Sequence, residues 1–175
     1  MKKQGFTLIE LMVVIVIMGI LAAVAVPKLF GMIAKSKASE VGPAAGTYVK
    51  LQDAFIAETG TYYGSWNKIG YTAPGQTAAG TASSATGSTT NFTYTQVGSY
   101  SADETATVPS GTGAQVWKAA NRLKLNDCPA GENWNIKLEA GGSAAGAVKY
   151  TAYYKDNDSE SKCSPLTAAF KNIGQ

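Results

Sequence analysis

The chain has 175 residues, enough for one domain and one membrane segment. Its 15 Lys and Arg against 12 Asp and Glu give a formal charge of +3, which is too mild to indicate nucleic-acid binding. The sequence contains no His, which excludes His-based catalytic triads and the common His-containing zinc sites.

A predominantly apolar stretch extends from Phe6 to Val26. Between Leu11 and Val26, Gly19 is the only residue that is not hydrophobic. As a helix, about 21 residues measure roughly 31 Å, the thickness of the hydrocarbon core of a bilayer. Glu10 is the one charged residue in the stretch, and a carboxylate inside an apolar span costs about 2.5–3.5 kcal/mol on insertion scales. We therefore expect a membrane-spanning helix in which Glu10 has a partner and a function.

Residues 1–5 form a short basic leader that is compatible with two interpretations. In the first, Lys2 and Lys3 begin an ordinary secretory signal that is cleaved after the small residues at 23–25. That signal would have an apolar core at or above the usual limit of about 15 residues, and Glu10 would have no role. In the second, the apolar helix is retained, and this interpretation rests on a resemblance to a known family.

The sequence GFTLIE at residues 5–10, followed at once by the apolar stretch, resembles the prepilin signature of type IV pilins and type II secretion pseudopilins. The resemblance is specific over residues 1–30 and weak beyond them. It implies that a prepilin peptidase cuts between Gly5 and Phe6 and then methylates the new amino group of Phe6. It also implies that the apolar helix anchors the subunit in the inner membrane and later forms the core of a filament.

The resemblance implies an assembly role for Glu10, in which its carboxylate pairs with the N-terminal amine of an adjacent subunit. Opposite charges about 4 Å apart attract far more strongly in a low dielectric than in water, although desolvation opposes this gain. The structural alternative is a carboxylate that only complements the dipole at the start of the helix, an effect of about 0.3–1 kcal/mol.

The charges that flank the apolar stretch do not settle its orientation. Lys2 and Lys3 precede it, and Lys28, Lys35 and Lys37 follow it closely. The positive-inside rule is therefore ambiguous or mildly contrary. Placement of the leader in the cytoplasm is implied by the resemblance alone.

Gly19 and Pro27 are candidate helix-breaking positions within and at the end of the apolar stretch. Pro removes a helical hydrogen bond and clashes with the preceding turn, and Gly costs about 1 kcal/mol of helix propensity. The resemblance implies that this segment can lose helicity in a filament. The alternative is a simple kink in an intact helix.

Helical periodicity continues beyond the apolar stretch to Glu58, which predicts one long helix over residues 6–59. Its second half is amphipathic and is expected to pack on a globular head. Gly42 and Pro43 are expected to bend the helix, and Gly60 to end it. The apolar positions that recur at helical spacing are Phe30, Ile33, Ala34, Val41, Ala45, Tyr48, Leu51 and Phe55.

The rest of the chain predicts a small antiparallel sheet. Residues 72–90 are almost entirely Gly, Ala, Ser and Thr with hardly a hydrophobe, which predicts a surface loop or a low-complexity insertion. Short alternating runs predict strands at residues 91–97, 114–123, 134–138 and 147–154. Turns are expected at residues 141–142 and 156–158, and sequential strands with tight turns favour antiparallel pairing, with the helix on one face.

Cys128 and Cys163 are the only two cysteines. Their separation is too long for a CxxC redox or zinc motif, and in an exported protein the simplest interpretation is one disulfide. Closing a loop of that length would stabilise the fold by about 3–4 kcal/mol on the chain-entropy model. The resemblance implies the same bond, since pilins carry a C-terminal disulfide loop that type II pseudopilins commonly lack.

Other chemistry finds little support in the sequence. Asp156, Asp158 and Glu160 alternate as in a calcium site, but the EF-hand glycine and distal glutamate are missing, so a solvated turn is expected. The aromatic residues are expected mainly in the core rather than on a carbohydrate-binding surface. We find no nucleophile–base pair, phosphate-binding loop or metal cluster, so an enzyme is not predicted.

The sequence thus predicts an α+β protein, with a long N-terminal helix packed on an antiparallel sheet as in the pilin fold. Its parts are a cleaved leader (1–5), a transmembrane and filament-core segment (6–27) and a globular head with the amphipathic half of the helix (28–175). The resemblance implies a structural subunit of a type IV pilus that forms an extracellular filament from copies of itself, for adhesion, motility or surface interaction.

That function requires no cofactor and no metal. The implied partners are prepilin peptidase, the inner-membrane pilus assembly machinery and, before assembly, the membrane that the chain crosses once. Two alternatives remain at this point: a pseudopilin of a type II secretion or DNA-uptake system, and a secreted binding protein with an ordinary signal peptide.

Overall fold

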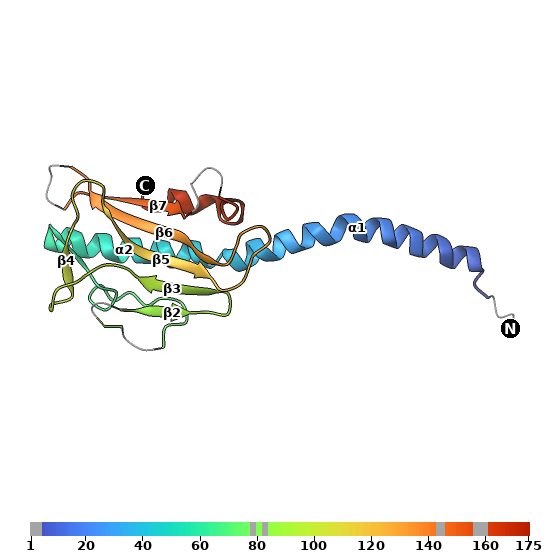
Figure 1. Ribbon diagram of the computed structural model, residues 1–175, viewed down its shortest axis with the longest axis horizontal. Helices are drawn as coiled ribbons and strands as arrows, with labels where there is room; N and C mark the ends of the chain where they lie inside the picture. The colour runs from blue at the N-terminus through green and yellow to red at the C-terminus, as the bar shows by residue number, and fades with distance from the viewer. Residues whose placement is uncertain (1–4, 78–79, 82–83, 143–145, 156–160) are drawn as a thin grey trace.

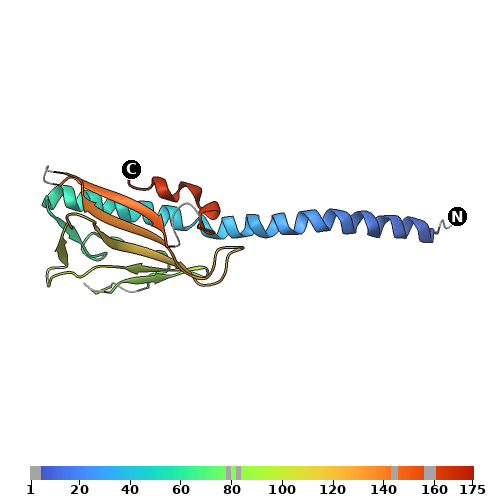
Figure 2. The same ribbon diagram turned by 45° about the horizontal axis from the view of Figure 1, so that its top comes forward.

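The computed structural model describes residues 5–77, 80–81, 84–142, 146–155 and 161–175. A long N-terminal helical rod carries a sheet-based head on its C-terminal half (Figure 1). The rod consists of α1 (Leu8–Ala38) and α2 (Val41–Thr59). Seen from a second direction, the first part of α1 extends well clear of the head (Figure 2). The predicted α+β architecture is confirmed.

The rod is interrupted at Ser39 and Glu40, between α1 and α2. We expected a bend at Gly42 and Pro43, and the interruption lies just before them. Pro43 has no N–H to donate to the carbonyl of Ser39, four residues back, and its ring clashes with that carbonyl. The proline therefore acts one turn upstream of its own position. The helix ends at Gly60 as expected, with φ of +79° and its N–H bonded to Ile56 O at 2.7 Å.

Five antiparallel strands form the main sheet in the order β2-β3-β5-β6-β7. The strands predicted from alternation are confirmed, with small shifts in their ends. A separate two-stranded sheet pairs β1 (Tyr62–Gly64) with β4 (Thr105–Thr107). The strands of the main sheet are β2 (Thr86–Ser88), β3 (Phe92–Gln96), β5 (Ala114–Asn121), β6 (Gly131–Ala140) and β7 (Val148–Tyr154).

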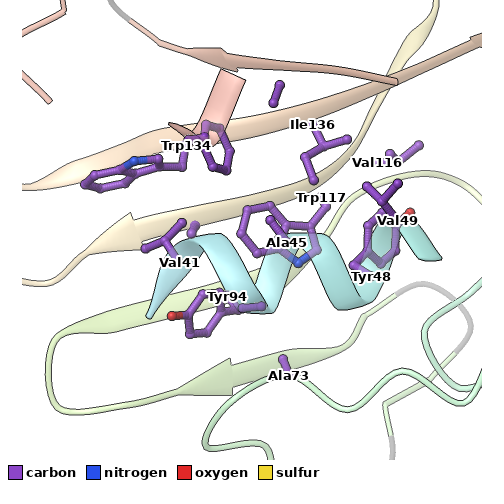
Figure 3. Close-up of a cluster of buried hydrophobic side chains, with 14 of the residues drawn as sticks. Val41, Ala45, Tyr48, Val49, Ala73, Tyr94, Val116, Trp117, Trp134 and Ile136 are labelled. Atoms are coloured by element: carbon purple, nitrogen blue, oxygen red, sulfur yellow. The ribbon is translucent and has the colours of Figure 1, made fainter. Parts of the chain in front are cut away.

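The core lies between α2 and one face of the main sheet (Figure 3). Val41, Ala45 and Tyr48 project from α2 toward the sheet, where they meet the indoles of Trp117 and Trp134. All five side chains are fully buried. Aromatic rings also pack edge to face across this core, such as Trp134 on Phe92 with centroids 5.3 Å apart.

Two details of the expected helix packing were wrong. Phe30 and Ile33 were expected on the stripe that packs against the head, but they are 61% and 42% exposed. The reason is that burial of α1 begins only at Ala34, so the first residues of the stripe lie beyond the end of the head. Conversely, the fully buried Ile56 belongs to the packed face of α2 and was not predicted there.

The segment at residues 72–90 is more ordered than its composition predicted. It contains β2, whose Gly87 pairs with Tyr94 of β3, and it contributes the buried Ala73 and Ala85 to the core. A Cβ on Gly87 would come within 2.6 Å of Pro74 O. The small residues that made this stretch resemble a loop therefore allow close packing of its backbone.

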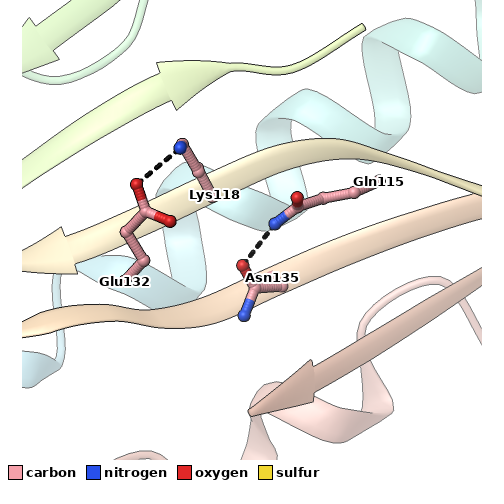
Figure 4. A network of polar contacts seen from close by, with 4 residues as sticks. All are labelled: Gln115, Lys118, Glu132 and Asn135. Atoms are coloured by element: carbon pink, nitrogen blue, oxygen red, sulfur yellow. Dashed lines mark hydrogen bonds and ion pairs between the residues drawn. The ribbon is translucent and has the colours of Figure 1, made fainter. Parts of the chain in front are cut away.

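The opposite face of the sheet carries polar side chains (Figure 4). Lys118 Nζ lies 2.5 Å from Glu132 Oε1, and Gln115 Nε2 donates to Asn135 Oδ1. Both pairs bridge β5 and β6. Lys118 follows the buried Trp117 and therefore points away from the core. A register shift between Gln115 and Trp117 brings Gln115 to the same polar face.

The C-terminal segment is joined to the sheet by the predicted disulfide, and Cys128 and Cys163 have Cα atoms 4.6 Å apart. Two 3-10 helices follow this bond, η1 (Ser164–Leu166) and η2 (Ala168–Asn172). Thr167 lies between the two 3-10 helices. Its Oγ1 accepts a hydrogen bond from Trp134 Nε1 and its carbonyl accepts one from Tyr154 Oη, which holds the segment on β6 and β7.

Candidate functional site

The exposed apolar surface of α1 is the most unusual feature of the molecule. Its large hydrophobic side chains between Leu8 and Ile33 are each 42–78% exposed. The best 18-residue window of the rod has a mean hydropathy of 2.9 and no buried residue, and it is long and apolar enough to cross a membrane. Soluble monomers rarely expose apolar patches of more than a few hundred Å². This surface therefore requires lipid or protein around it.

The proposed processing position lies just before this helix. Gly5 and Phe6 are exposed and precede the first helical residue, Leu8. A Cβ on Gly5 would meet nothing within 4 Å, and Phe6 is 84% exposed. The peptide bond between them is thus outside the helical hydrogen-bond pattern and sterically open. The rest of the expected leader, residues 1–4, lies outside the described residues.

Glu10 participates in a capping box at the start of α1. Thr7 is the N-cap residue, and its hydroxyl accepts a hydrogen bond from Glu10 N at 3.3 Å. In return, Glu10 Oε2 accepts bonds from Thr7 N at 2.8 Å and from Thr7 Oγ1 at 2.6 Å. The helix start thereby gains partners for backbone groups that would otherwise be unpaired.

The role of Thr7 was missed in the sequence analysis, although the signal was present. A Thr followed three residues later by a Glu, just before an apolar run, is the pattern of a capping box. The structure therefore adds a local role for Glu10 to the one that the resemblance implied. Pairing of Glu10 with an amine of another subunit concerns an assembly of chains and stays a prediction.

Neither candidate helix-breaking position interrupts the isolated rod. α1 continues through Gly19 and contains Pro27 within its span. Of the two alternatives considered from the sequence, the single chain thus adopts the intact helix. Loss of helicity in a filament is a property of the assembly and stays a prediction.

Within the described residues, no group of three or more His, Cys, Asp or Glu side chains comes together as a metal site. The acidic run considered for calcium, residues 156–160, lies outside the described part of the chain. Most of the aromatic residues are in the core as expected, including Tyr63, Trp66 and Tyr154, whereas Tyr62 is 46% exposed.

Residues 1–26 match the family described as the prokaryotic N-terminal methylation motif. The match covers the expected leader, the capping box and most of the exposed part of α1. The chain carries this methylation motif and is similar to type IV pilins.

Curated relatives of this chain include pilin and fimbrial proteins. It is 41% identical over 70 residues to the type IV major pilin protein PilA of Myxococcus xanthus, covering 40% of this chain and 32% of the relative. It is 56% identical over 39 residues to the type IV major fimbrial protein FimA of Dichelobacter nodosus, covering 22% and 25%. It is 42% identical over 60 residues to the fimbrial protein EcpC of Eikenella corrodens, covering 34% and 39%.

The matched part of this pilin-like chain spans between a quarter and two fifths of the length of these relatives. No solved structure matches the chain at a significant level. The likeness to pilins in the head rests instead on its own architecture, in which a helix covers one face of an antiparallel sheet and a disulfide closes the C-terminal segment.

Proposed function

We propose that this chain is a structural subunit of a type IV pilus, which assembles through its apolar N-terminal helix into an extracellular filament. The observation that carries the proposal is the contrast between the two parts of the molecule. The head has a well-packed core with three fully buried tryptophans, whereas the large side chains of α1 are exposed as far as Ile33. A helix that is hydrophobic all round requires apolar surroundings.

Before assembly, those surroundings are the inner membrane. Prepilin peptidase cuts the leader, residues 1–5, at the exposed bond between Gly5 and Phe6, and Phe6 becomes the methylated N-terminus. Residues 6–27 cross the bilayer once, and residues 28–175 form the head with the amphipathic half of the rod. The length supports this division, because about 20 helical residues cross roughly 30 Å of hydrocarbon.

During assembly, the same residues 6–27 exchange lipid for the helices of sister subunits. The net gain is smaller than that of burial from water, since lipid tails are as apolar as the side chains. A specific contact must therefore align the subunits, and an ion pair between Glu10 and the Phe6 amine of a neighbour supplies it. In low dielectric such a pair is strongly attractive once its desolvation is offset.

Gly19 and Pro27 are the positions at which α1 would open in the filament. Pro27 already lacks a helical hydrogen-bond donor, and Gly19 has the weakest helix propensity of its surroundings. Unwinding there lengthens the rod without disturbing the head, whose packing begins at Ala34.

The test is to produce the chain in cells that have a pilus assembly system, with a strain lacking the chain as control. We expect an intact mass and N-terminal sequence that begin at methylated Phe6, and filaments in electron micrographs that contain the chain. A mature chain beginning after residue 25 would show an ordinary signal peptide and contradict the proposal. Correct processing without any filament would favour a pseudopilin of a secretion or DNA-uptake system.

A further inference from the structure

Basic residues gather at the end of the head that faces the exposed part of α1. Three lie on α1 itself and two on the loop between β5 and β6, and all five side chains are exposed. In the sequence, the three on α1 made the orientation of the membrane span ambiguous, and the assembly role of α1 uses none of the five. We call them the basal cluster: Lys28, Lys35, Lys37, Arg122 and Lys124.

The β5–β6 loop reaches α1 in space. Both ribbon views place it at the end of the head nearer the exposed rod (Figures 1 and 2). Lys124 and Asn126 of this loop share the wall of a cavity of about 370 Å³ with Phe30 and Lys37 of α1. Beside them, Leu123 is 71% exposed although it is a large apolar residue. The loop therefore presents one apolar side chain between two basic ones.

The loop is fixed in position by buried contacts at its root. Asn121 Nδ2 donates to Leu123 O at 2.9 Å and to Pro129 O at 2.8 Å. Asn133 Nδ2 donates to Asn121 Oδ1 at 2.6 Å, and Cys128 is tied to the C-terminal segment by the disulfide. Leu123 is consequently exposed on a loop whose backbone is held in place by hydrogen bonds and the disulfide.

The part of this surface nearest the exposed rod lies at the height of the headgroup layer of a bilayer. If the hydrocarbon ends near Pro27, Phe30 lies roughly 5 Å and Lys37 roughly 15 Å beyond it at about 1.5 Å per residue. The polar layer on each side of the hydrocarbon is roughly 5–8 Å thick. Lys28 and Phe30 thus lie within this layer and Lys37 beyond it. Lys and Arg side chains snorkel with their stems on apolar surface, so the rest of the cluster reaches the headgroups when the rod is tilted toward the loop.

The charge of the surface is positive. Against the five basic groups, the described residues nearby place two carboxylates, Asp127 in the loop and Glu40 at the helix interruption. Glu40 Oε1 already accepts hydrogen bonds from Thr89 and Tyr94. Glu132 at the start of β6 is paired with Lys118.

We propose that this surface docks the head on anionic phospholipid headgroups while the chain is anchored in the membrane. The basal cluster binds lipid phosphates, and Leu123 enters the boundary between headgroups and acyl chains. The proposal rests on the membrane-anchored precursor of the proposed function and is independent of the filament. It accounts for basic residues on the head side of the span, where the positive-inside rule does not require them.

The test uses the full chain with Leu123→Trp, at one chain per lipid nanodisc. The discs contain brominated phosphatidylcholine, with or without phosphatidylglycerol, and the readout is quenching of tryptophan fluorescence by bromine. The three native tryptophans are fully buried and provide a constant background. We expect stronger quenching at position 123 in the anionic discs, and a decrease of this difference at high salt because counter-ions screen exposed charges.

Two sets of variants complete the test. In the Leu123→Trp background, Lys37→Gln and Lys124→Gln should each weaken docking by about fivefold, the effect of one basic residue near an anionic surface. Lys68→Gln removes the same charge from an exposed residue beside β1 and should have no effect. Tyr62→Trp in place of Leu123→Trp puts a reporter at the far end of α2 and should be unquenched in both kinds of disc.

Equal quenching at position 123 in both kinds of disc, or equal quenching at positions 62 and 123, would overturn the proposal. If the tryptophan at position 123 is shielded from bromine quenching only when each disc holds two chains, the surface binds a second copy of the chain. That result would also overturn the proposal. These results leave the proposed pilus function intact. A chain that does not enter the discs at all contradicts the membrane anchor, and with it both proposals.

Discussion

Glu10 and Thr7 hydrogen-bond each other across the first turn of α1, and Glu10 Oε2 lies 2.8 Å from the backbone N of Thr7. Within the described residues, Oε2 accepts both of the hydrogen bonds that reach this carboxylate, which leaves Oε1 available. A carboxylate has lone pairs for several donors. The local cap and an ion pair with the amine of a second subunit can therefore coexist on one side chain.

The first prediction separates the cap from the charge. Glu10→Gln can retain both hydrogen bonds of the capping box but loses the negative charge, whereas Glu10→Ala loses both. If the ion pair aligns the subunits, both variants should insert into the membrane and fail to form filaments. The measurements are the amount of chain in the membrane fraction and the filament yield in electron micrographs.

Thr7→Ala is the matched control, because it removes the capping hydroxyl and keeps the charge. It should weaken the helix start by about 0.5–2 kcal/mol and still yield filaments. Normal filaments from Glu10→Gln would show that the cap alone matters and would refute the ion pair.

The second prediction concerns the disulfide between Cys128 and Cys163, which are separated by 35 positions. Cys128→Ser, Cys163→Ser and the double variant should each lose about 3–4 kcal/mol of unfolding free energy on the chain-entropy model. Urea unfolding of the full chain in detergent, followed by near-ultraviolet circular dichroism of the buried tryptophans, measures this loss. A double variant that is much less stable than either single variant would contradict a role limited to their shared bond.

The third prediction concerns Gln52, a fully buried polar residue of α2. With its amide nitrogen toward Gly64 O (3.0 Å) and its oxygen toward Gly64 N (2.8 Å), it bonds both backbone groups of this residue in β1. Gln52→Leu leaves these groups unpaired, so the unfolding free energy should fall by about 1–3 kcal/mol. Lys50→Leu, at an exposed position two residues away, should change it by less than about 0.5 kcal/mol. Equal stability of the two variants would exclude this role for Gln52.

The fourth prediction is a loss of head stability in alkali. Burial raises the pKa of Tyr71 to about 12, and its hydroxyl donates to Ala44 O of α2 at 3.1 Å. Between pH 10 and pH 12 the unfolded chain loses this proton while the folded chain retains it. The unfolding free energy therefore falls as the pH rises through this window, by about 2–3 kcal/mol for this group.

Tyr71→Phe is the control for that pH dependence, since it cannot lose a proton. It should be less stable than the parent chain near pH 8, because Ala44 O loses its donor, and its stability should fall less steeply above pH 10. The measurement is urea unfolding at a series of pH values. An unchanged slope above pH 10 would contradict the contribution of Tyr71.

Local patterns in the sequence determined the rod and most of the strands. An apolar run of membrane length, with a single carboxylate near its start, specifies an exposed helix whatever the rest of the chain does. Alternation likewise located β3, β5, β6 and β7, because side chains on a half-buried strand must take opposite faces. The capping box of Thr7 and Glu10 could have been found in the same way.

Only the tertiary structure decided where the head begins and what lies beside it. The apolar stripe on the rod continues through Phe30 and Ile33. Burial starts only at Ala34, because the head covers the rod no further toward the N-terminus. Short strands such as β1 and β4 carry no periodicity of their own, since distant partners define them. The basal cluster joins residues of α1 to residues of the β5–β6 loop nearly ninety positions away, and no local pattern can encode such a contact. The contact between α1 and the loop arises from the order of the strands and from the hydrogen bonds and disulfide that fix the loop, all of which depend on long-range packing.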